Sequence, residues 1–369
     1  MTLSLALTGN EPRQRYLFET LESLAHVAAL VSFDDIDPLT RYLAAALSFA
    51  WPRSEWWENY HMHPLVQRRR RHVLARELSH VPERIDALLM WGSWFQPFRD
   101  TSPRVPTFHY IDQSRSLHNL PGERVGRFSR RKRSHELQAK TYEAAARVFC
   151  MSEWAREQTL ESHKLDPLKV TAVGWGPCAV DLSGEDLEHT ARKPLVLHIS
   201  NDFHRKGIDF LLATAERVCT AVPDAHFVVI GRDARGANPP QSSRRVSFLG
   251  RISDRQVLSS YFRQASVFFL PHRFDRSPHV LVEAMSAALP LVASEQGGAI
   301  ELIRDQGTGF LRRAGDVPGY ADAIIEILRD HDLRRTLGRR AQTLVRTRYN
   351  WPAISKQIVS EISALVGVT

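Results

Sequence analysis

Two acidic residues, Asp275 and Glu283, stand eight positions apart in one short segment of the chain. A carboxylate within an apolar helical run is costly unless it meets hydrogen-bond donors, and the hydroxyl groups of a sugar or ribose are such donors. The pair also has a simpler interpretation, in which Asp275 caps a helix and Glu283 is solvated, because acidic residues are common near helix N-termini. Taken alone, the two residues leave both interpretations open.

The surrounding sequence predicts how these carboxylates are positioned. Ser266–Leu270 is a short apolar run that ends at Pro271, as is typical of a buried parallel strand. From His279 to Ala288 the apolar residues follow a helical spacing, and Ser277 and Pro278 are suited to be its N-cap and first-turn proline. The backbone N–H groups at residues 278–281 would then attract an anion such as a phosphate.

A second strand-to-helix turn follows directly. Pro290–Ser294 is another apolar strand, and it leads through Gly297 and Gly298 into a helix that contains Glu301. Adjacent glycines let the backbone approach a bound ligand closely. Two such turns in one segment therefore predict a ligand site at the carboxyl ends of these strands.

This segment resembles the donor side of the retaining glycosyltransferases of family 4, also called glycosyl transferases group 1. Their signature has two glutamates separated by seven residues, the second in a Glu-Ala-Met run, and then a Pro-Val-Val-Ala-Ser strand and a Gly-Gly turn. The corresponding residues here are Asp275, Glu283-Ala284-Met285, Pro290–Ser294 and Gly297-Gly298. Aspartate replaces the first glutamate, and Arg276, Ser277 and Pro278 replace the small glycines that often follow it.

The resemblance implies a role for each polar residue. Glu283 would bind the ribose hydroxyls and Asp275 the donor sugar. Lys206, in the family's Lys-Gly pair, would bind the donor diphosphate together with Arg205 and the helix start. The family's earlier arginine is Asn201 here. An exposed lysine at a helix start is the alternative interpretation of Lys206, but it would oppose the helix dipole.

The predicted site also includes His109, at the end of the strand Pro106–Asp112, where family members often place a histidine facing the donor sugar. A strand histidine with an ordinary hydrogen bond is the alternative. The predicted catalytic residues are Asp275, Lys206 and His109. The predicted donor-binding residues are Glu283, Arg205, Asn201, Ser277, Pro278, His279, Val280, Gly231, Arg251, Gly297 and Gly298. No metal or other cofactor is expected, and no Asp-x-Asp pair stands in a suitable loop.

The predicted fold class is α/β, with doubly wound parallel sheets. The resemblance implies the GT-B arrangement of two Rossmann-like domains facing a central cleft, with an acceptor-side domain over residues 1–185 and a nucleotide-sugar domain over 186–345. It also implies that a C-terminal helix over 346–369 crosses back to the first domain. Apolar runs at 195–200, 226–231 and 246–249, separated by helical segments, indicate the second sheet.

The composition is that of an ordinary globular protein, with 43% hydrophobic and 24% charged residues. The sequence contains no run of about 18 apolar residues, so no membrane-spanning helix is predicted. The first residues favour a strand over a signal peptide. Three widely spaced cysteines favour a reducing compartment such as the cytoplasm and argue against a zinc site.

The net charge of +8 is unevenly distributed. Residues 1–190 carry 24 Lys+Arg and 24 Asp+Glu, whereas residues 191–369 carry 25 and 17. A domain that holds a diphosphate explains this excess without nucleic acid. One block of arginines, Arg68–Arg71, follows several aromatic residues, Trp51, Trp56, Trp57 and Tyr60. Such a block could contact an anionic membrane surface or acceptor, or it could belong to a helical hairpin whose arginines are solvated. Arg127–Arg133 suits similar anionic partners, or a solvated loop.

The resemblance to family 4 therefore implies a glycosyltransferase that moves a sugar from a nucleotide-diphosphate sugar to an unidentified acceptor, with retention and without a metal. One alternative is a catalytically degenerate relative that acts as a binding or scaffold protein. Another is a protein that binds anionic surfaces through its arginine blocks. Turnover of a nucleotide sugar separates the first hypothesis from the second, and salt-dependent binding to polyanions favours the third.

Overall fold

The computed structural model describes residues 2–9, 14–33, 35–49, 56, 59–92, 97, 105–112, 128–187, 193–233, 245–304 and 307–368, with the backbone alone for 128–134. These residues fold into two compact units. The first unit contains the described residues up to Val173 together with 351–368, and the second contains those from Gly174 to Asn350. Gly174 to Glu185, predicted to end the first domain, lie in the second unit.

The first unit is built on a six-stranded parallel sheet in the order β2-β1-β3-β4-β5-β6. Its strands are β1 (Ser4–Thr8), β2 (His26–Val31), β3 (Ala87–Trp91), β4 (Thr107–Ile111), β5 (Arg147–Cys150) and β6 (Val170–Ala172). Every residue of β1, β3 and β4 is buried, as expected for central strands of a parallel sheet that is covered on both faces.

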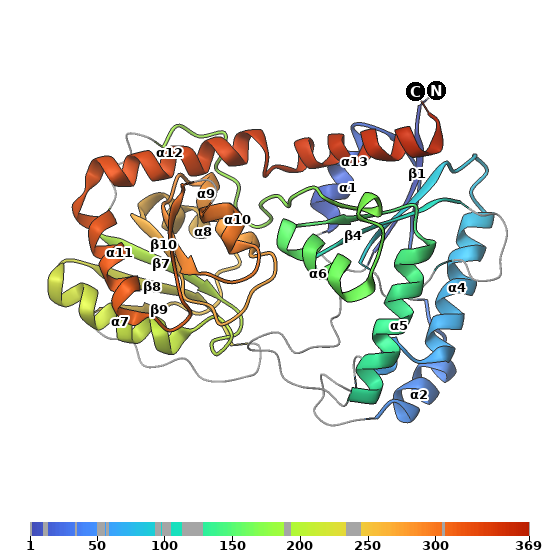
Figure 1. Cartoon of the computed structure of the whole chain (residues 1–369), viewed down its shortest axis with the longest axis horizontal. Coiled ribbons are helices and arrows are strands. Elements are labelled where there is room, and N and C mark those ends of the chain that lie inside the picture. Colours follow the sequence, from blue (N-terminus) through green and yellow to red (C-terminus); the bar gives the residue numbers. More distant parts are fainter. Residues whose placement is uncertain are drawn as a thin grey trace. The chain divides into compact units, whose positions relative to one another are not determined.

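The helices of the first unit include one from the far end of the chain (Figure 1). Thr20 on α1 and Ser355 on α13 share a hydrogen bond of 2.7 Å, and Arg147 on β5 forms an ion pair with Glu361 on α13. The helices are α1 (Gln14–Glu22), α2 (Pro38–Leu47), α4 (Pro64–Ser79), α5 (Phe128–Ala144), α6 (Glu153–His163) and α13 (Trp351–Val366), with a 3₁₀ turn at Pro167–Lys169.

The second unit has another six-stranded parallel sheet, in the order β12-β11-β10-β7-β8-β9. Its strands are β7 (Leu195–Ser200), β8 (His226–Gly231), β9 (Val246–Phe248), β10 (Val267–Leu270), β11 (Leu291–Ser294) and β12 (Gly309–Arg312). Its helices are α7 (Ile208–Ala221), α8 (Arg255–Gln264), α9 (His279–Ser286), α10 (Ala299–Ile303), α11 (Val317–Arg329) and α12 (His331–Thr347).

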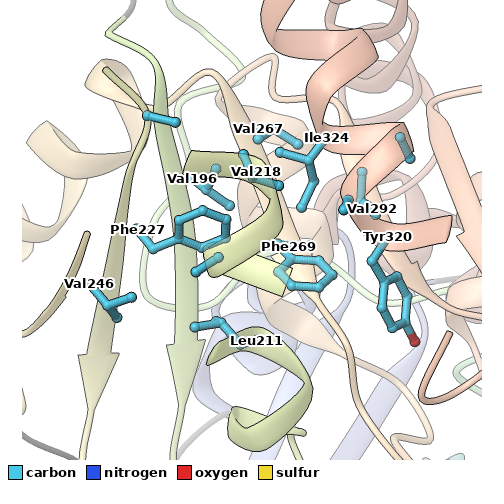
Figure 2. Close-up of a cluster of buried hydrophobic side chains, with 14 of the residues drawn as sticks. Val196, Leu211, Val218, Phe227, Val246, Val267, Phe269, Val292, Tyr320 and Ile324 are labelled. Carbon is cyan, nitrogen blue, oxygen red and sulfur yellow. The ribbon is translucent and has the colours of Figure 1, made fainter. Parts of the chain in front are cut away.

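One apolar cluster holds the second sheet to its helices (Figure 2). Phe227 on β8 and Phe269 on β10 are fully buried, and Tyr320 on α11 packs edge-on against Phe269 with ring centroids 5.1 Å apart. The Tyr320 hydroxyl meets the Ser294 hydroxyl at 2.6 Å, which satisfies both polar groups inside the core. This packing gives the strand ends of the unit a rigid base.

The elements agree closely with those predicted from the sequence. Both sheets are parallel and doubly wound, so the predicted pair of Rossmann-like domains is confirmed. In the first unit, β6 ends at Ala172 and the chain turns at Gly174, where φ is +87°. None of the helices within the described residues is long and apolar enough to cross a membrane.

Candidate functional site

The strand order of the second unit predicts a ligand site at the carboxyl ends of β7 and β10. The chain winds outward from β7 through β8 and β9 on one side, and from β10 through β11 and β12 on the other. Open α/β sheets bind ligands where the strand order reverses in this way. The loops that follow β7 and β10 are therefore the candidate site, and they carry most of the predicted residues.

The backbones of these two loops are joined directly. The N–H of Arg273 donates to the carbonyl oxygen of Arg205 at 2.8 Å. Gly207 has a φ of +73°, and a Cβ atom there would lie 1.9 Å from the carbonyl oxygen of Pro271. Glycine is required at this close approach, and it places the residue before it, Lys206, over the loop after β10.

Lys206 and Asp275 form a buried ion pair between the two loops, with side-chain exposures of 7% and 15%. A nitrogen of the Arg205 guanidinium lies 3.5 Å from the other oxygen of Asp275. Burial would raise the pKa of the Asp275 carboxyl, but the positive charges of Lys206 and Arg205 outweigh it and hold that pKa well below its usual range. The interpretations of Lys206 as exposed and of Asp275 as a helix cap are both wrong.

Arg205 also connects to a third predicted residue. Its guanidinium donates to the carbonyl oxygen of Phe274 at 3.1 Å and to the side-chain oxygen of Asn201 at 3.4 Å. The side chain of Arg205 thus remains partly exposed, whereas that of Lys206 is nearly buried. Two cations are therefore close together, although the family's earlier arginine is absent.

Glu283 points to the segment that opens the second unit. One of its carboxylate oxygens accepts hydrogen bonds from the backbone N–H groups of Ala179 at 2.8 Å and Cys178 at 3.3 Å. The residue is 6% exposed, so the solvated interpretation is wrong. Glu283 holds the 178–179 backbone against α9, and its predicted contact with a ribose stays a prediction.

The N-terminus of α9 differs from the predicted cap. The N-cap residue is Pro278, whose side chain accepts no capping hydrogen bond from the first turn. Ser277, the predicted cap, is buried, and its hydroxyl has no hydrogen-bond partner in the described part of the chain. His279 Nδ1 lies 3.1 Å from the carbonyl oxygen of Gly176, and Val280 is partly buried. An uncapped helix start beside two cations suits an anion.

The paired glycines Gly297 and Gly298 pack on the Asp275 loop. A Cβ atom on Gly297, where φ is +58°, would lie 1.8 Å from the carbonyl oxygen of Asp275. The N–H of Gly298 donates to the carbonyl oxygen of Arg276 at 2.7 Å. Packing against this backbone explains why both positions are glycine, and contact with a donor stays a prediction.

Gly231 and Arg251 lie at the next two strand ends. A Cβ atom on Gly231 would lie 1.8 Å from the carbonyl oxygen of Ser200 on β7, so this glycine lets β7 and β8 approach. The N–H of Gly231 donates to the carbonyl oxygen of Gly250 at 2.7 Å, which brings the end of β8 beside Arg251. Arg251 is exposed, and its predicted role in binding the donor remains to be tested.

His109 lies inside the first unit, in the middle of β4. Its side chain is completely buried, and its Nδ1 lies 2.9 Å from the carbonyl oxygen of Gly92. Burial lowers the pKa of the ring to about 4, so His109 is neutral near pH 7 and its Nδ1–H donates to Gly92. Its Nε2 has no hydrogen-bond partner among the described residues. This environment fits a core histidine, and a catalytic role stays a prediction.

Residues 193–330, from β7 through α11, match the sequence profile of the family described as "Glycosyl transferases group 1". The second unit carries a glycosyl transferases group 1 domain. The predicted resemblance is therefore confirmed for this part of the chain. Phosphatidyl-myo-inositol mannosyltransferase of Mycolicibacterium smegmatis is 33% identical over 170 residues, which are 45% of this chain and 44% of that protein.

A second relative of the group 1 domain has a different acceptor in its name. N-acetyl-alpha-D-glucosaminyl L-malate synthase of Bacillus anthracis is 27% identical over 177 residues, which are 46% of this chain and 44% of that protein. The chain thus spans less than half the length of either relative. Among solved structures, sucrose-phosphate synthase from Thermosynechococcus elongatus is similar over all of both chains, with a TM-score of 0.70 and 20% identity. That similarity supports the fold alone.

The group 1 domain contains buried polar residues that sequence reasoning missed. His272 is fully buried, with Nδ1 2.9 Å from the carbonyl oxygen of Leu270 and Nε2 3.2 Å from that of Gln296. It therefore ties the loop after β10 to the loop after β11. On β7, the buried Ser200 hydroxyl has no hydrogen-bond partner among the described residues. A polar residue within or next to an apolar strand is the signal that identifies both.

The described residues contain no group of three or more His, Cys, Asp or Glu side chains placed to hold a metal ion. The candidate site instead combines a buried ammonium group, a guanidinium group, an uncapped helix start and two carboxylates. Such a set can bind an anion beside a group rich in hydroxyls.

Proposed function

We propose that this chain is a retaining glycosyltransferase that transfers a sugar from a nucleotide-diphosphate sugar to an acceptor without a metal. The observation that carries the proposal is the Lys206–Asp275 pair at the topological switch point of a group 1 domain. Relatives whose names describe mannosyl transfer and glucosaminyl-malate synthesis support it. The expected class is a hexosyl or related sugar transferase.

In this proposal the site changes partners when the donor binds. The diphosphate takes over Lys206 and Arg205, together with the start of α9, and Asp275 is released to accept hydrogen bonds from the donor sugar. Glu283 meets the ribose with the oxygen that does not hold the 178–179 backbone. The Lys206 ammonium group would exchange its ion pair with the Asp275 carboxylate for one with the phosphate. Its charge stays neutralised in both states, so Lys206 need not enter water between them.

Transfer would proceed on the face from which the leaving group departs. The bond between the anomeric carbon and the phosphate oxygen breaks, and a bond from the acceptor oxygen to the same carbon forms. A phosphate oxygen of the departing nucleotide accepts the acceptor proton. Lys206 and Arg205 stabilise the charge that develops on that phosphate, an electrostatic contribution of a few kcal/mol when water is excluded.

The first test is thermal stability of the protein in the presence of UDP, GDP, ADP and their common sugar conjugates. Free nucleotide at a hundredfold its dissociation constant stabilises by about 2.7 kcal/mol, which is readily measured. Glu283→Gln, which retains one acceptor for the 178–179 backbone, should lose the shift. Glu326→Gln, on the exposed face of α11, should keep it. If no nucleotide shifts the wild-type transition, the proposal is overturned.

Two further measurements address the reaction itself. Nuclear magnetic resonance of the product reports whether the anomeric configuration of the donor is retained. Turnover in the presence of a strong chelator reports whether a metal is required. Inversion of configuration, or loss of turnover that added metal restores, would contradict the corresponding part of the proposal.

A second candidate function is a binding or scaffold protein that has lost catalysis. Its support is that Asp275 is already neutralised by Lys206 and Arg205, with Asn201 in place of the family arginine. Nucleotide binding without turnover on any acceptor tested would favour this candidate. Turnover of a nucleotide sugar would exclude it.

A further inference from the structure

Helix α2 of the first unit presents large apolar side chains to solvent. Leu39, Tyr42, Leu43 and Leu47 have exposed fractions of 69%, 74%, 48% and 70%, and Phe49, just after the helix, is 74% exposed. The spacing of three and four residues places Leu39, Tyr42, Leu43 and Leu47 along one side of the helix. These five residues are called the α2 face below.

The side of α2 that packs on the protein is made of small residues instead. Ala44 is the one buried residue of the helix, and it packs with Ile36 and Val66. The carbonyl oxygen of Ala45 accepts a hydrogen bond from the indole of Trp56 at 2.8 Å. Helix α2 thus exposes its large apolar residues, whereas an ordinary surface helix buries them. An apolar stripe left outside indicates an interaction surface.

Arginines accompany this surface on the neighbouring helix. α4 packs against α2 (Figure 1), and its outward residues Leu65, Arg68 and His72 recur at a helical spacing that places them on one side. Arg68 is exposed and forms no ion pair within the described residues. Over residues 35–49 and 59–79, five arginines and three carboxylates are exposed or half-buried, because Arg70 is buried. The surroundings of the α2 face are therefore positively charged.

We propose that the α2 face docks onto a lipid bilayer that contains anionic headgroups. A helix of this kind lies in the plane of the membrane surface, with its apolar side among the acyl chains and its basic neighbours at the headgroups. Aromatic side chains such as Tyr42 suit the boundary between these layers. The proposal does not depend on the transferase activity, because it concerns a different part of the fold.

The size of the face favours lipid over a protein partner. A ten-residue helix is about 15 Å long and about 10 Å wide, whereas a stable protein interface buries about 800 Å² on each partner. A single stripe on one helix is small for that purpose, but a bilayer needs no matching surface. The predicted contributions of Trp51 and Trp57, and of the side chains in Arg127–Arg133, lie outside what the structure describes.

Cosedimentation with lipid vesicles tests the proposal. The wild-type protein should sediment with vesicles of phosphatidylcholine and phosphatidylglycerol, and at least tenfold less with phosphatidylcholine alone. The double variant Leu43→Gln/Leu47→Gln should lose at least tenfold in binding to the mixed vesicles, because two leucines no longer enter the apolar layer. Leu168→Gln is the matched control, since Leu168 is a leucine 79% exposed at a separate site of the same unit.

Arg68→Glu tests the electrostatic part, and it should reduce binding to the mixed vesicles severalfold and weaken its salt dependence. Equal binding of the wild type and the double variant would overturn the proposal. So would a wild-type dimer in the absence of lipid that the double variant abolishes, because a second copy would then cover the face. Both variants should keep the wild-type melting temperature and the nucleotide-induced shift, so failure here is distinct from failure of the transferase proposal.

Discussion

The Lys206 ammonium and the Asp275 carboxylate, 69 residues apart in the chain, form a buried ion pair that joins the loop after β7 to the loop after β10. Two backbone features hold the pair in place. The N–H of Arg273 donates to the carbonyl oxygen of Arg205, and Gly207 rests on the carbonyl of Pro271. The strand order brings these loops together, so the fold itself assembles the charged centre of the candidate site.

Replacing Asp275 with Asn should destabilise the protein as well as abolish transfer. The amide leaves the buried Lys206 without its counter-charge, and breaking one side of a buried pair typically costs about 3–5 kcal/mol. Chemical denaturation of the variant measures this loss. Asp209→Asn is the control, because the Asp209 carboxylate is 59% exposed in its pair with Arg273, and exposed pairs contribute about 1 kcal/mol or less.

The same pair predicts a dependence on pH. The pKa of the Asp275 carboxyl is lower in the folded state than in the unfolded chain. The ionised carboxyl therefore contributes fully to the free energy of unfolding above the ordinary carboxyl pKa of 3.8, and this contribution is lost as the pH falls below that value. The stability difference between wild type and Asp275→Asn should therefore be constant from pH 7 to about pH 5 and should narrow below about pH 4. A difference that narrows near neutral pH would contradict the buried pair.

Glu283 should show two separable effects when it is changed. Glu283→Ala removes the acceptor of the Cys178 and Ala179 N–H groups, and an unsatisfied buried donor costs about 1–3 kcal/mol. Glu283→Gln retains one acceptor oxygen and should lose less stability. Both variants should lose nucleotide binding if Glu283 meets the ribose. Thermal melting with and without nucleotide measures both effects, and retained binding in Glu283→Gln would argue for a purely structural role.

Much of this architecture could be predicted from the sequence, because apolar runs bounded by glycine and proline define the strands. β7 and β8 have the bounds predicted for them. The edge of the sheet that carries the candidate site could be located as well, since the residues after β7 and β10 follow carboxyl ends of parallel strands. The Lys206–Asp275 contact could not, because it depends on which strands are neighbours and on the register between them.

The failures came from residues whose partners are distant in the chain. Ser277 has the residue type of an N-cap, but helix α9 begins one residue later, and the Ser277 hydroxyl has no hydrogen-bond partner among the residues that the structure describes. The sequence around Glu283 is compatible with a solvated position, but its carboxylate accepts hydrogen bonds from the 178–179 backbone. Gly297 and Gly298 pack against the Asp275 loop, a second reason for glycine that local pattern did not indicate, and their predicted ligand contact stays a prediction. Local pattern predicts the backbone better than it predicts the partner of a polar side chain.

His109 should make the stability of the protein fall as the pH decreases from about 6.5 to about 4. Its ring stays neutral in the folded state down to a pKa of about 4, whereas the unfolded chain binds a proton near pH 6.5. The accumulated loss is on the order of 3 kcal/mol. The His109→Gln variant has no ring to titrate and so lacks this pH-dependent loss of stability. The difference in free energy of unfolding between wild type and variant should therefore shrink as the pH falls from about 6.5 to about 4. Parallel curves would show that His109 titrates normally and reaches solvent.

Gly207→Ala should weaken both the fold and the Lys206–Asp275 pair. A left-handed φ at a residue other than glycine costs on the order of 1–3 kcal/mol, and the new Cβ atom would lie 1.9 Å from the carbonyl oxygen of Pro271. Gly184→Ala is the control, since nothing lies within 4 Å of a Cβ atom there. It should change the free energy of unfolding by less than about 0.5 kcal/mol.

The reason for expecting coupling is that the clash can be relieved only if the two loops separate, and that separation also pulls Lys206 away from Asp275. A double-mutant cycle with Asp275→Asn measures this directly. Gly207→Ala should cost less in the Asp275→Asn background than in the wild type, because the pair it disrupts is already broken there. Strictly additive free energies would mean that Gly207 supports α7 without positioning Lys206.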